Sequence, residues 1–348
     1  PLETNKQYHF DTFKLNNFLI KKCQENDIKL YDDEITKVNI QKGNIYSIQS
    51  KTKEYKHDFY IDSTGFKRLL ISKLGAKWKS YKEYLPMNEA IAFPTKDTKE
   101  YTPYTTSKAM SAGWMWRIPT NGRWGNGYVY NNKFINAEQA KIECEKYLGH
   151  KIEIGKNIKF EAGTIDRPWI GNCVATGLSS SFIEPLEASS IGTSIQQAFI
   201  LMHILINYTE KDIQLYNKRF KAIIENIRDF VLLHYLTGKK DSKFWKQYKP
   251  NLPLSLKENL KTWHKRLPMK EDFDGEYNLF KPENFSVVLK ELNLFDKKSI
   301  KKEFNSLSQP YKDYVYKEVD RQTTWNNSVE TISHKKYLQK VCSGGLPK

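Results

Sequence analysis

The sequence lacks most of the features that mark secreted, metal-binding or membrane proteins. Its 348 residues include four cysteines, Cys23, Cys144, Cys173 and Cys342. No two of them have C-x-x-C spacing or lie near a histidine in a zinc-like pattern, so we expect reduced, mostly buried thiols and no metal site. No apolar run approaches the roughly 20 residues of a membrane span. The first residues do not resemble a signal peptide, and we expect a cytoplasmic protein without a membrane partner.

A concentrated block of one charge is also missing. The net charge is +16, from 56 Lys and Arg against 40 Asp and Glu, and such a balance could indicate a nucleic-acid partner. The basic residues, however, are scattered from Lys6 to Lys348, mostly beside acidic ones, whereas phosphate binding needs a concentrated basic face. We therefore interpret the charge as a solvated surface and expect no nucleic-acid partner. An aromatic content of 14% argues against disorder.

Apolar periodicity divides the chain into a mixed α/β part and a mostly helical part. The patterns predict strands at residues 28–30, 35–40, 45–48, 58–62, 158–165 and 172–176, with three more inside 87–131 and a turn at 121–122. They predict helices at 13–23, 137–148 (capped near Asn136), 191–208 and 212–236. The last helix should turn a set of apolar residues to the core: Leu215, Phe220, Ile223, Ile227 and Phe230. We expect an α/β (α+β) protein with residues 1–195 as its α/β part and 196–348 as its helical part.

The stretch from Gly171 to Ile191, G-N-C-V-A-T-G-L-S-S-S-F-I-E-P-L-E-A-S-S-I, is the most informative part of the chain. It runs from a short apolar strand through Gly and Ser into an acidic turn and then into a helix. Free backbone N–H groups at such a helix start can cradle a cofactor or an anion. Glu187 stands where the helix should begin, so we expect part of the chemistry here.

Several motifs in a fixed order indicate a family. They are Asp62-Ser63-Thr64-Gly65-Phe66, Gly113-Trp114-Met115-Trp116-Arg117-Ile118-Pro119, Gly127-Tyr128-Val129-Tyr130, Glu184-Pro185-Leu186-Glu187, and Asp229-Phe230 with His234-Tyr235. In these segments the chain resembles the flavin-dependent tryptophan halogenases, from residue 8 to about residue 290. The resemblance implies an FAD-dependent monooxygenase-like fold. It also implies that reduced FAD, supplied by a separate flavin reductase, and oxygen oxidise chloride or bromide to hypohalous acid, which halogenates a small electron-rich aromatic such as an indole.

The resemblance assigns a role to one acidic side chain and to four neighbours of a bound flavin and halide. Glu187 matches the active-site glutamate; without the flanking match it would be an acidic residue favoured by the helix dipole. Ser189 and Ser190 match positions whose backbone N–H groups bind halide, although a plain Ser N-cap is the simpler alternative. Leu178 and Ile191 match flavin-contacting positions.

Three further positions follow from the same match. Trp114 and Trp116 correspond to an aromatic wall between flavin and substrate, and two residues two apart on a strand point the same way. Packing in a sheet core is the alternative for both, and the two roles are compatible. Ile35 matches an apolar position near the adenine half of FAD.

The chain also departs from the family pattern. No G-x-G-x-x-G turn precedes Tyr8, so we expect the N-terminal dinucleotide-binding βαβ unit and the family's lysine to be absent and the chain to match the later two-thirds or more of a halogenase. Ala188 replaces the usual Ser after Glu187, which bears on rate and substrate preference. The segment from Tyr311 to Tyr316 does not match the family's tryptophan-gripping segment, which favours indoles over free tryptophan. A flavin monooxygenase and a non-catalytic remnant remain alternatives, and a homo-oligomer is left open.

Overall fold

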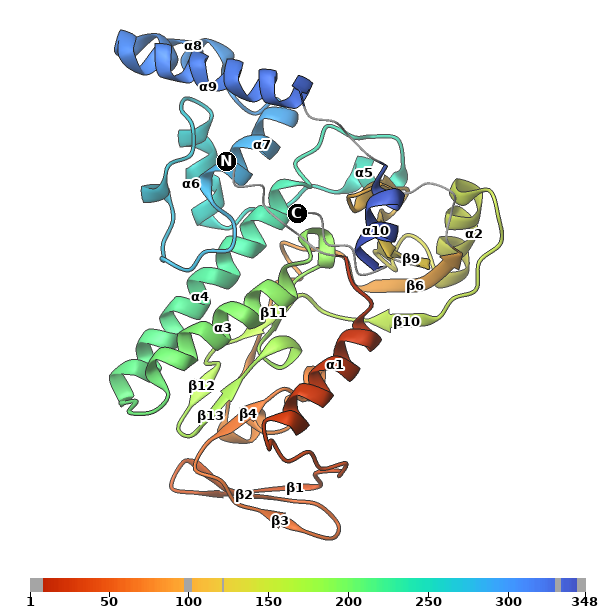
Figure 1. Ribbon diagram of the computed structural model, residues 1–348, viewed down its shortest axis with the longest axis vertical. Coiled ribbons are helices and arrows are strands. Elements are labelled where there is room, and N and C mark those ends of the chain that lie inside the picture. Colours follow the sequence, from red (N-terminus) through yellow and green to blue (C-terminus); the bar gives the residue numbers. More distant parts are fainter. Residues whose placement is uncertain (1–8, 97–101, 121, 329–332, 343–348) are drawn as a thin grey trace.

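A computed structural model describes residues 9–96, 102–120, 122–328 and 333–342 of the chain. Short sheets occupy the first half and helices the second, so the predicted mixed α/β class is confirmed (Figure 1). Helix α1 (Thr12–Glu25) is capped by Asp11, whose carboxylate accepts the amides of residues 13 and 14. It precedes a small antiparallel sheet made of β1 (Lys37–Gln41), β2 (Asn44–Gln49) and β3 (Glu54–Tyr55).

A five-stranded antiparallel sheet forms the largest β-layer, in the order β10-β6-β9-β8-β7. Its strands are β6 (Glu89–Lys96), β7 (Thr106–Met110), β8 (Gly113–Thr120), β9 (Arg123–Tyr130) and β10 (Lys156–Lys159). Because side chains alternate along a strand, Met115 and Tyr128 pack toward α2 (Ala137–Leu148). Trp114 and Val129 face the opposite way and join the main core with the C-terminal helices. The sheet thus lies between α2 and the helical part.

A second layer contains the only parallel strand pair in the described part of the chain. Strand β4 (Tyr60–Asp62) runs parallel to β13 (Cys173–Ala175), which pairs antiparallel with β12 (Trp169–Ile170). No strand among the described residues pairs with the outer edge of β4. Helices α3 (Ser189–Ile204) and α4 (Glu210–Leu233) pack together beside this layer (Figure 1). A fourth sheet joins β5 (Trp78–Ser80), β11 (Gly163–Ile165) and β14 (Ser181–Phe182).

Helix α4 carries most of the core in the second half of the chain. Of the residues predicted to face inward, Phe220, Ile223, Ile227 and Phe230 are buried. Leu215 is 37% exposed, which corrects that prediction: Ile213 and Tyr216 occupy the inward positions of this turn, and Leu215 lies off the stripe. The remaining helices follow in order: α5 (Lys243–Gln247), α6 (Leu254–Trp263), α7 (Pro282–Glu291), α8 (Lys297–Ser306), α9 (Gln309–Ser328) and α10 (His334–Cys342).

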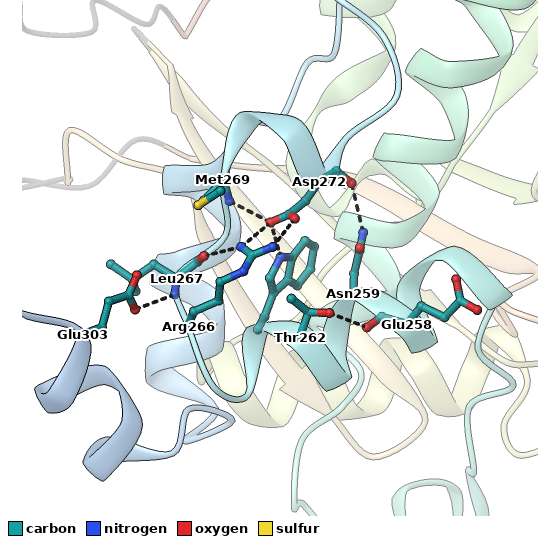
Figure 2. A network of polar contacts seen from close by, with 9 residues as sticks. Glu258, Asn259, Thr262, Arg266, Leu267, Met269, Asp272 and Glu303 are labelled. Carbon is teal, nitrogen blue, oxygen red and sulfur yellow. Dashed lines mark hydrogen bonds and ion pairs between the residues drawn. The ribbon is translucent and has the colours of Figure 1, made fainter. Parts of the chain in front are cut away.

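The turn after α6 is fixed by one partly buried ion pair between Arg266 and Asp272, shown in Figure 2. Asp272 accepts hydrogen bonds from the Arg266 guanidinium (2.8 Å), the Trp263 indole (2.9 Å) and the backbone N–H of Met269 (2.8 Å). The Arg266 hydrogen bond lowers the pKa of Asp272 to about 2. Charge-assisted bonds of this kind are about twice as strong as neutral ones, so they hold the loop that leads into α7.

The local predictions succeeded where a capping or alternation signal was clear. Asn136 caps α2 and exchanges hydrogen bonds with Gln139, as the sequence suggested. The strand predicted at 28–30 is wrong, since these residues form no regular structure, and the predicted strand 158–165 is two separate strands, β10 and β11. The predicted turn at 121–122 falls partly outside the described residues. Within the described residues, no helix combines the length and apolarity needed to cross a membrane.

Candidate active site

The carboxyl ends of β4 and β13 are bound together by one buried carboxylate. Asp62 is fully buried and accepts hydrogen bonds from the backbone N–H groups of Leu70 (2.9 Å) and Ile71 (2.8 Å). It also accepts the hydroxyls of Thr64 (2.7 Å) and Ser179 (3.1 Å). Ligands of open α/β sheets bind outside the carboxyl ends of parallel strands. Asp62 therefore shapes the two loops at the edge where a cofactor is expected.

The second of these loops leads into the E-P-L-E turn. Pro185–Glu187 form a single 3-10 turn, followed by Ala188 with φ 48° and ψ 32°, a left-handed conformation that is uncommon outside glycine. Helix α3 then begins at Ser189, two residues later than the position of Glu187 had suggested. The residue at Ala188 offers no side-chain oxygen, and no side chain caps the first turn of α3. The first N–H groups of the helix are therefore available to an anion.

Ser189 and Ser190, the predicted halide positions, are the first two residues of α3. The side chain of Ser189 is buried and that of Ser190 is exposed. Neither hydroxyl caps the helix, which removes the alternative of a plain Ser N-cap. As the first residues of a helix, they have backbone N–H groups without an acceptor inside the helix.

Leu178 and Ile191, the predicted flavin contacts, lie on adjacent elements. Leu178 belongs to the 3-10 turn Gly177–Ser179 after β13, and this turn packs against α3. A Cβ on Gly177 would lie 3.7 Å from Ser194 Oγ. Leu178 is 36% exposed and Ile191 is 53% exposed. Two exposed apolar side chains at the carboxyl end of a parallel pair suit a planar aromatic cofactor.

Glu187 is held by a histidine from the end of α4. His234 Nε2 lies 3.0 Å from Glu187 Oε1, and the side chains are 25% and 32% exposed. On its other side, His234 Nδ1 lies 2.9 Å from the carbonyl oxygen of Phe230, one helical turn earlier. Glu187 therefore has one oxygen fixed by the imidazole and one oxygen directed elsewhere.

The other carboxylate of the E-P-L-E turn is fully buried. Glu184 Oε2 accepts hydrogen bonds from the Tyr235 hydroxyl and from Trp114 Nε1 (3.3 Å). Its Oε1 is buried and has no hydrogen-bond partner in the described part of the chain. Burial raises the pKa of Glu184 to about 7, although both of these hydrogen bonds act to lower it. The turn thus joins a carboxylate that faces outward to one that faces the core.

Trp114 and Trp116 do lie on one face of β8, as the alternation predicts. Their ring centroids are 6.0 Å apart at an interplanar angle of 53°. Trp114 is 4% exposed, and its indole N–H ends on Glu184. Trp116 lies over Gly127 of β9, where a Cβ would come within 2.0 Å of the ring. The predicted core role and a wall role are therefore compatible in this geometry.

The structure brings seven of the eight predicted site residues onto adjoining elements. Ile35 is the exception, because it lies in the irregular segment before β1, whereas the others lie on β8, on α3 and on the turns between β13 and α3. Sequence reasoning assigned no role to Asp62, Glu184, His234 or Tyr235. Each stands inside a motif that we quoted, but only the folded chain shows which groups they contact.

Comparison with known proteins shows which family the chain resembles. The family model "Tryptophan halogenase" matches residues 2–302. The tryptophan 6-halogenase SttH of Streptomyces toxytricini is 30% identical over 296 residues, which cover 81% of this chain and 56% of that protein. The 7-chloro-L-tryptophan 6-halogenase KtzR of Kutzneria sp. (strain 744) is 31% identical over 296 residues, covering 81% and 57%.

Solved structures give the same result. The tryptophan halogenase from Shewanella frigidimarina NCIMB 400 superposes with a TM-score of 0.89 at 25% identity, over 99% of this chain and 70% of that one. The SttH structure superposes with a TM-score of 0.77 at 29% identity, over 86% and 63%. The chain spans a little over half the length of the curated relatives that it matches, at 56% and 57%. By its motifs, its fold and these matches, the chain belongs to the tryptophan halogenase family.

Proposed function

We propose that this protein is a flavin-dependent halogenase that attaches chlorine or bromine to an electron-rich aromatic ring of the indole class. The observation that carries the proposal is the seven-residue run from Glu184 to Ser190. Within it, the Glu184 carboxylate accepts the indole N–H of Trp114, and the Glu187 carboxylate contacts His234. Helix α3 then begins without a side-chain cap. A base, an aromatic wall and an anion site are thus assembled on a single turn.

FAD fits the residues at the carboxyl end of the parallel pair. Leu178 and Ile191 would contact the ring system, with Ile35 toward the adenine end, and the loops fixed by Asp62 would frame it. Reduced FAD with oxygen supplies the oxidising power that turns a bound halide into hypohalous acid. A separate flavin reductase would deliver the reduced cofactor.

The chain's own residues would do the rest of the chemistry. The first N–H groups of α3, at Ser189 and Ser190, would hold the halide without any basic side chain. Trp114 and Trp116 would keep the aromatic substrate away from the flavin, so that oxidation reaches it only through the halide. The free oxygen of Glu187 would hydrogen-bond the electrophile or accept the ring proton after attack.

The proposal also assigns separate roles to the two parts of the chain. Residues 1–195 would hold flavin and halide, and residues 196–348 would form the substrate side. Position 195 lies within α3 (Ser189–Ile204), so this helix would serve both parts: its start binds the halide and its body packs against α4.

The test is incubation of the protein with reduced FAD, oxygen, bromide and indole. Brominated indole is expected, and a reaction without bromide should give none. A hydroxylated product instead would identify a monooxygenase of the same fold. Flavin titration is the companion measurement, because a protein that binds no FAD would be a remnant and not an enzyme.

A further inference from the structure

His234 approaches Glu187 through a ring whose two nitrogens face different partners. Nδ1 lies 2.9 Å from the Phe230 carbonyl oxygen, and a carbonyl can only accept a hydrogen bond. Nδ1 must therefore carry a hydrogen. Nε2 lies 3.0 Å from a carboxylate oxygen of Glu187, which also only accepts when it is ionised.

These two contacts fix the number of protons. A neutral imidazole with its hydrogen on Nδ1 has a bare Nε2, and a bare nitrogen facing an ionised carboxylate is repulsive. One more proton must lie between Nε2 and Oε1. This proton forms a hydrogen bond along the Nε2–Oε1 line, and that bond holds the carboxylate of Glu187 in place.

We propose that His234 is a positioning residue for Glu187: it shares one proton with Oε1, fixes the carboxylate, and leaves Oε2 as the oxygen that meets the substrate. This inference rests on the proposed function and adds a residue to it. In the substitution, the C–H bond at the halogenated carbon breaks, its electron pair restores the aromatic ring, and the proton goes to Oε2. The pair then returns a proton to solvent, to which both side chains are partly open.

The surroundings isolate this pair from other charges. Within the described residues, Glu187 is the one acid in ion-pair contact with His234, and His234 is the one cation in such contact with Glu187. The Phe230 ring packs edge-on against the imidazole at 5.0 Å and brings no charge. The nearby acid Glu184 faces Tyr235 and Trp114 instead. A change in the ring-nitrogen signals of His234 should therefore reflect its contact with Glu187.

Histidine-specific ¹⁵N NMR of the chain tests the shared proton without any cofactor. The chain has seven histidines, and loss of one signal in the His234→Gln variant assigns His234. We expect the Nε2 signal of His234 to show a hydrogen bond to Glu187 and its Nδ1 signal to show one to the Phe230 carbonyl oxygen. In Glu187→Gln, the Nε2 signal should shift, whereas the Nδ1 signal should stay in place.

His264 provides an internal control in the same spectra. Its Nδ1 lies 2.8 Å from the Leu294 carbonyl oxygen, as His234 lies from Phe230, but no acid is in ion-pair contact with it in the described part of the chain. The ring-nitrogen signals of His264 should not move in Glu187→Gln. An unchanged Nε2 signal of His234 in that variant, or a bare Nδ1 in the unmodified protein, would overturn the proposal.

Activity gives a second, separable readout. Gln at 234 can donate an N–H to Glu187 but cannot bind a proton, whereas Ala can do neither. In the bromide assay we expect the kcat of His234→Gln to be at least tenfold higher than that of His234→Ala. The pH profile of His234→Gln should differ from that of the unmodified enzyme. An unchanged kcat and pH profile in His234→Ala would refute the positioning role. Absence of brominated product from the unmodified enzyme would instead remove the halogenase proposal and leave the NMR result standing.

Discussion

The buried carboxylate of Glu184 should make the stability of the fold depend on pH near neutrality. Its side chain is fully buried, one oxygen has no hydrogen-bond partner in the described part of the chain, and burial raises its pKa from 4.5 to about 7. In the unfolded chain the group would titrate near 4.5. Between these two pH values the folded protein binds more protons than the unfolded one, so the free energy of unfolding falls as pH rises.

The magnitude follows from the difference of about 2.5 pKa units. At about 1.4 kcal/mol per unit, the full effect is about 3 kcal/mol. It is entirely present below pH 4.5 and is lost as pH rises through about 7. Between pH 5 and pH 8 the expected loss from this one group is about 2.5 kcal/mol, which is a large share of the 5–15 kcal/mol that typically stabilises a protein.

The perturbation that isolates it is Glu184→Gln. Glutamine keeps the shape and can still accept the hydrogen bonds of Tyr235 and Trp114, but it does not titrate. Urea unfolding gives the free energy of unfolding at pH 5 and at pH 8. The loss between these two pH values should be about 2.5 kcal/mol smaller in the variant than in the unmodified protein. At pH 8 the variant should therefore be the more stable protein.

Glu161 offers a matched control. Glu161 also accepts a tryptophan indole N–H, from Trp78 at 3.0 Å, but its side chain is exposed. Glu161→Gln should leave the pH slope of the unfolding free energy in place. If Glu184→Gln and the unmodified protein lose the same free energy between pH 5 and pH 8, the buried acid does not control this slope and the reasoning is refuted.

Three further substitutions test the site and its frame. Glu187→Gln should lower the rate of bromination about 10²–10⁴-fold with a nearly unchanged urea midpoint; near-normal product formation would remove Glu187 from the chemistry. Gly127→Ala drives a Cβ to within 2.0 Å of the Trp116 ring and should cost about 1–3 kcal/mol in unfolding free energy, whereas Gly125→Ala, with its nearest neighbour at 3.8 Å, should be close to neutral. Asp62→Ala leaves two buried backbone N–H groups without their acceptor, at about 1–3 kcal/mol each, and a stability within 1 kcal/mol of the parent would show that this carboxylate is replaceable.

The sequence predicted those features of the fold that depend on neighbours along the chain. Alternation placed Trp114 and Trp116 on one face of a strand, and the cap at Asn136 located α2. The strand at 28–30 failed because two apolar residues, one on either side of Lys29, do not distinguish a strand from an extended loop whose side chains stay exposed. The prediction for Leu215 failed because the apolar stripe drifts round the helix. In this turn the core contains the neighbouring positions Ile213 and Tyr216 instead.

The site was predicted only as far as single positions allow. The motif led us to propose Glu187 as the catalytic acid, but its contact partner comes from the end of α4, far along the chain. Asp62 likewise accepts one of its hydrogen bonds from Ser179, 117 residues further on. Such long-range polar contacts carry no periodicity, because each depends on where a complete helix or strand packs. A sequence motif can thus suggest a reacting group without naming the group that holds it.

The end of α4 controls both carboxylates of the E-P-L-E turn at once. The consecutive residues His234 and Tyr235 contact Glu187 and Glu184 respectively, so one short segment reaches an exposed acid and a buried one. Two acids in different environments can take different roles in one site. Here His234 holds Glu187 by a contact at a partly exposed position, whereas burial favours the neutral form of Glu184. A shift of this segment would disturb the contacts of both acids together, and with Glu184 it would also move Trp114.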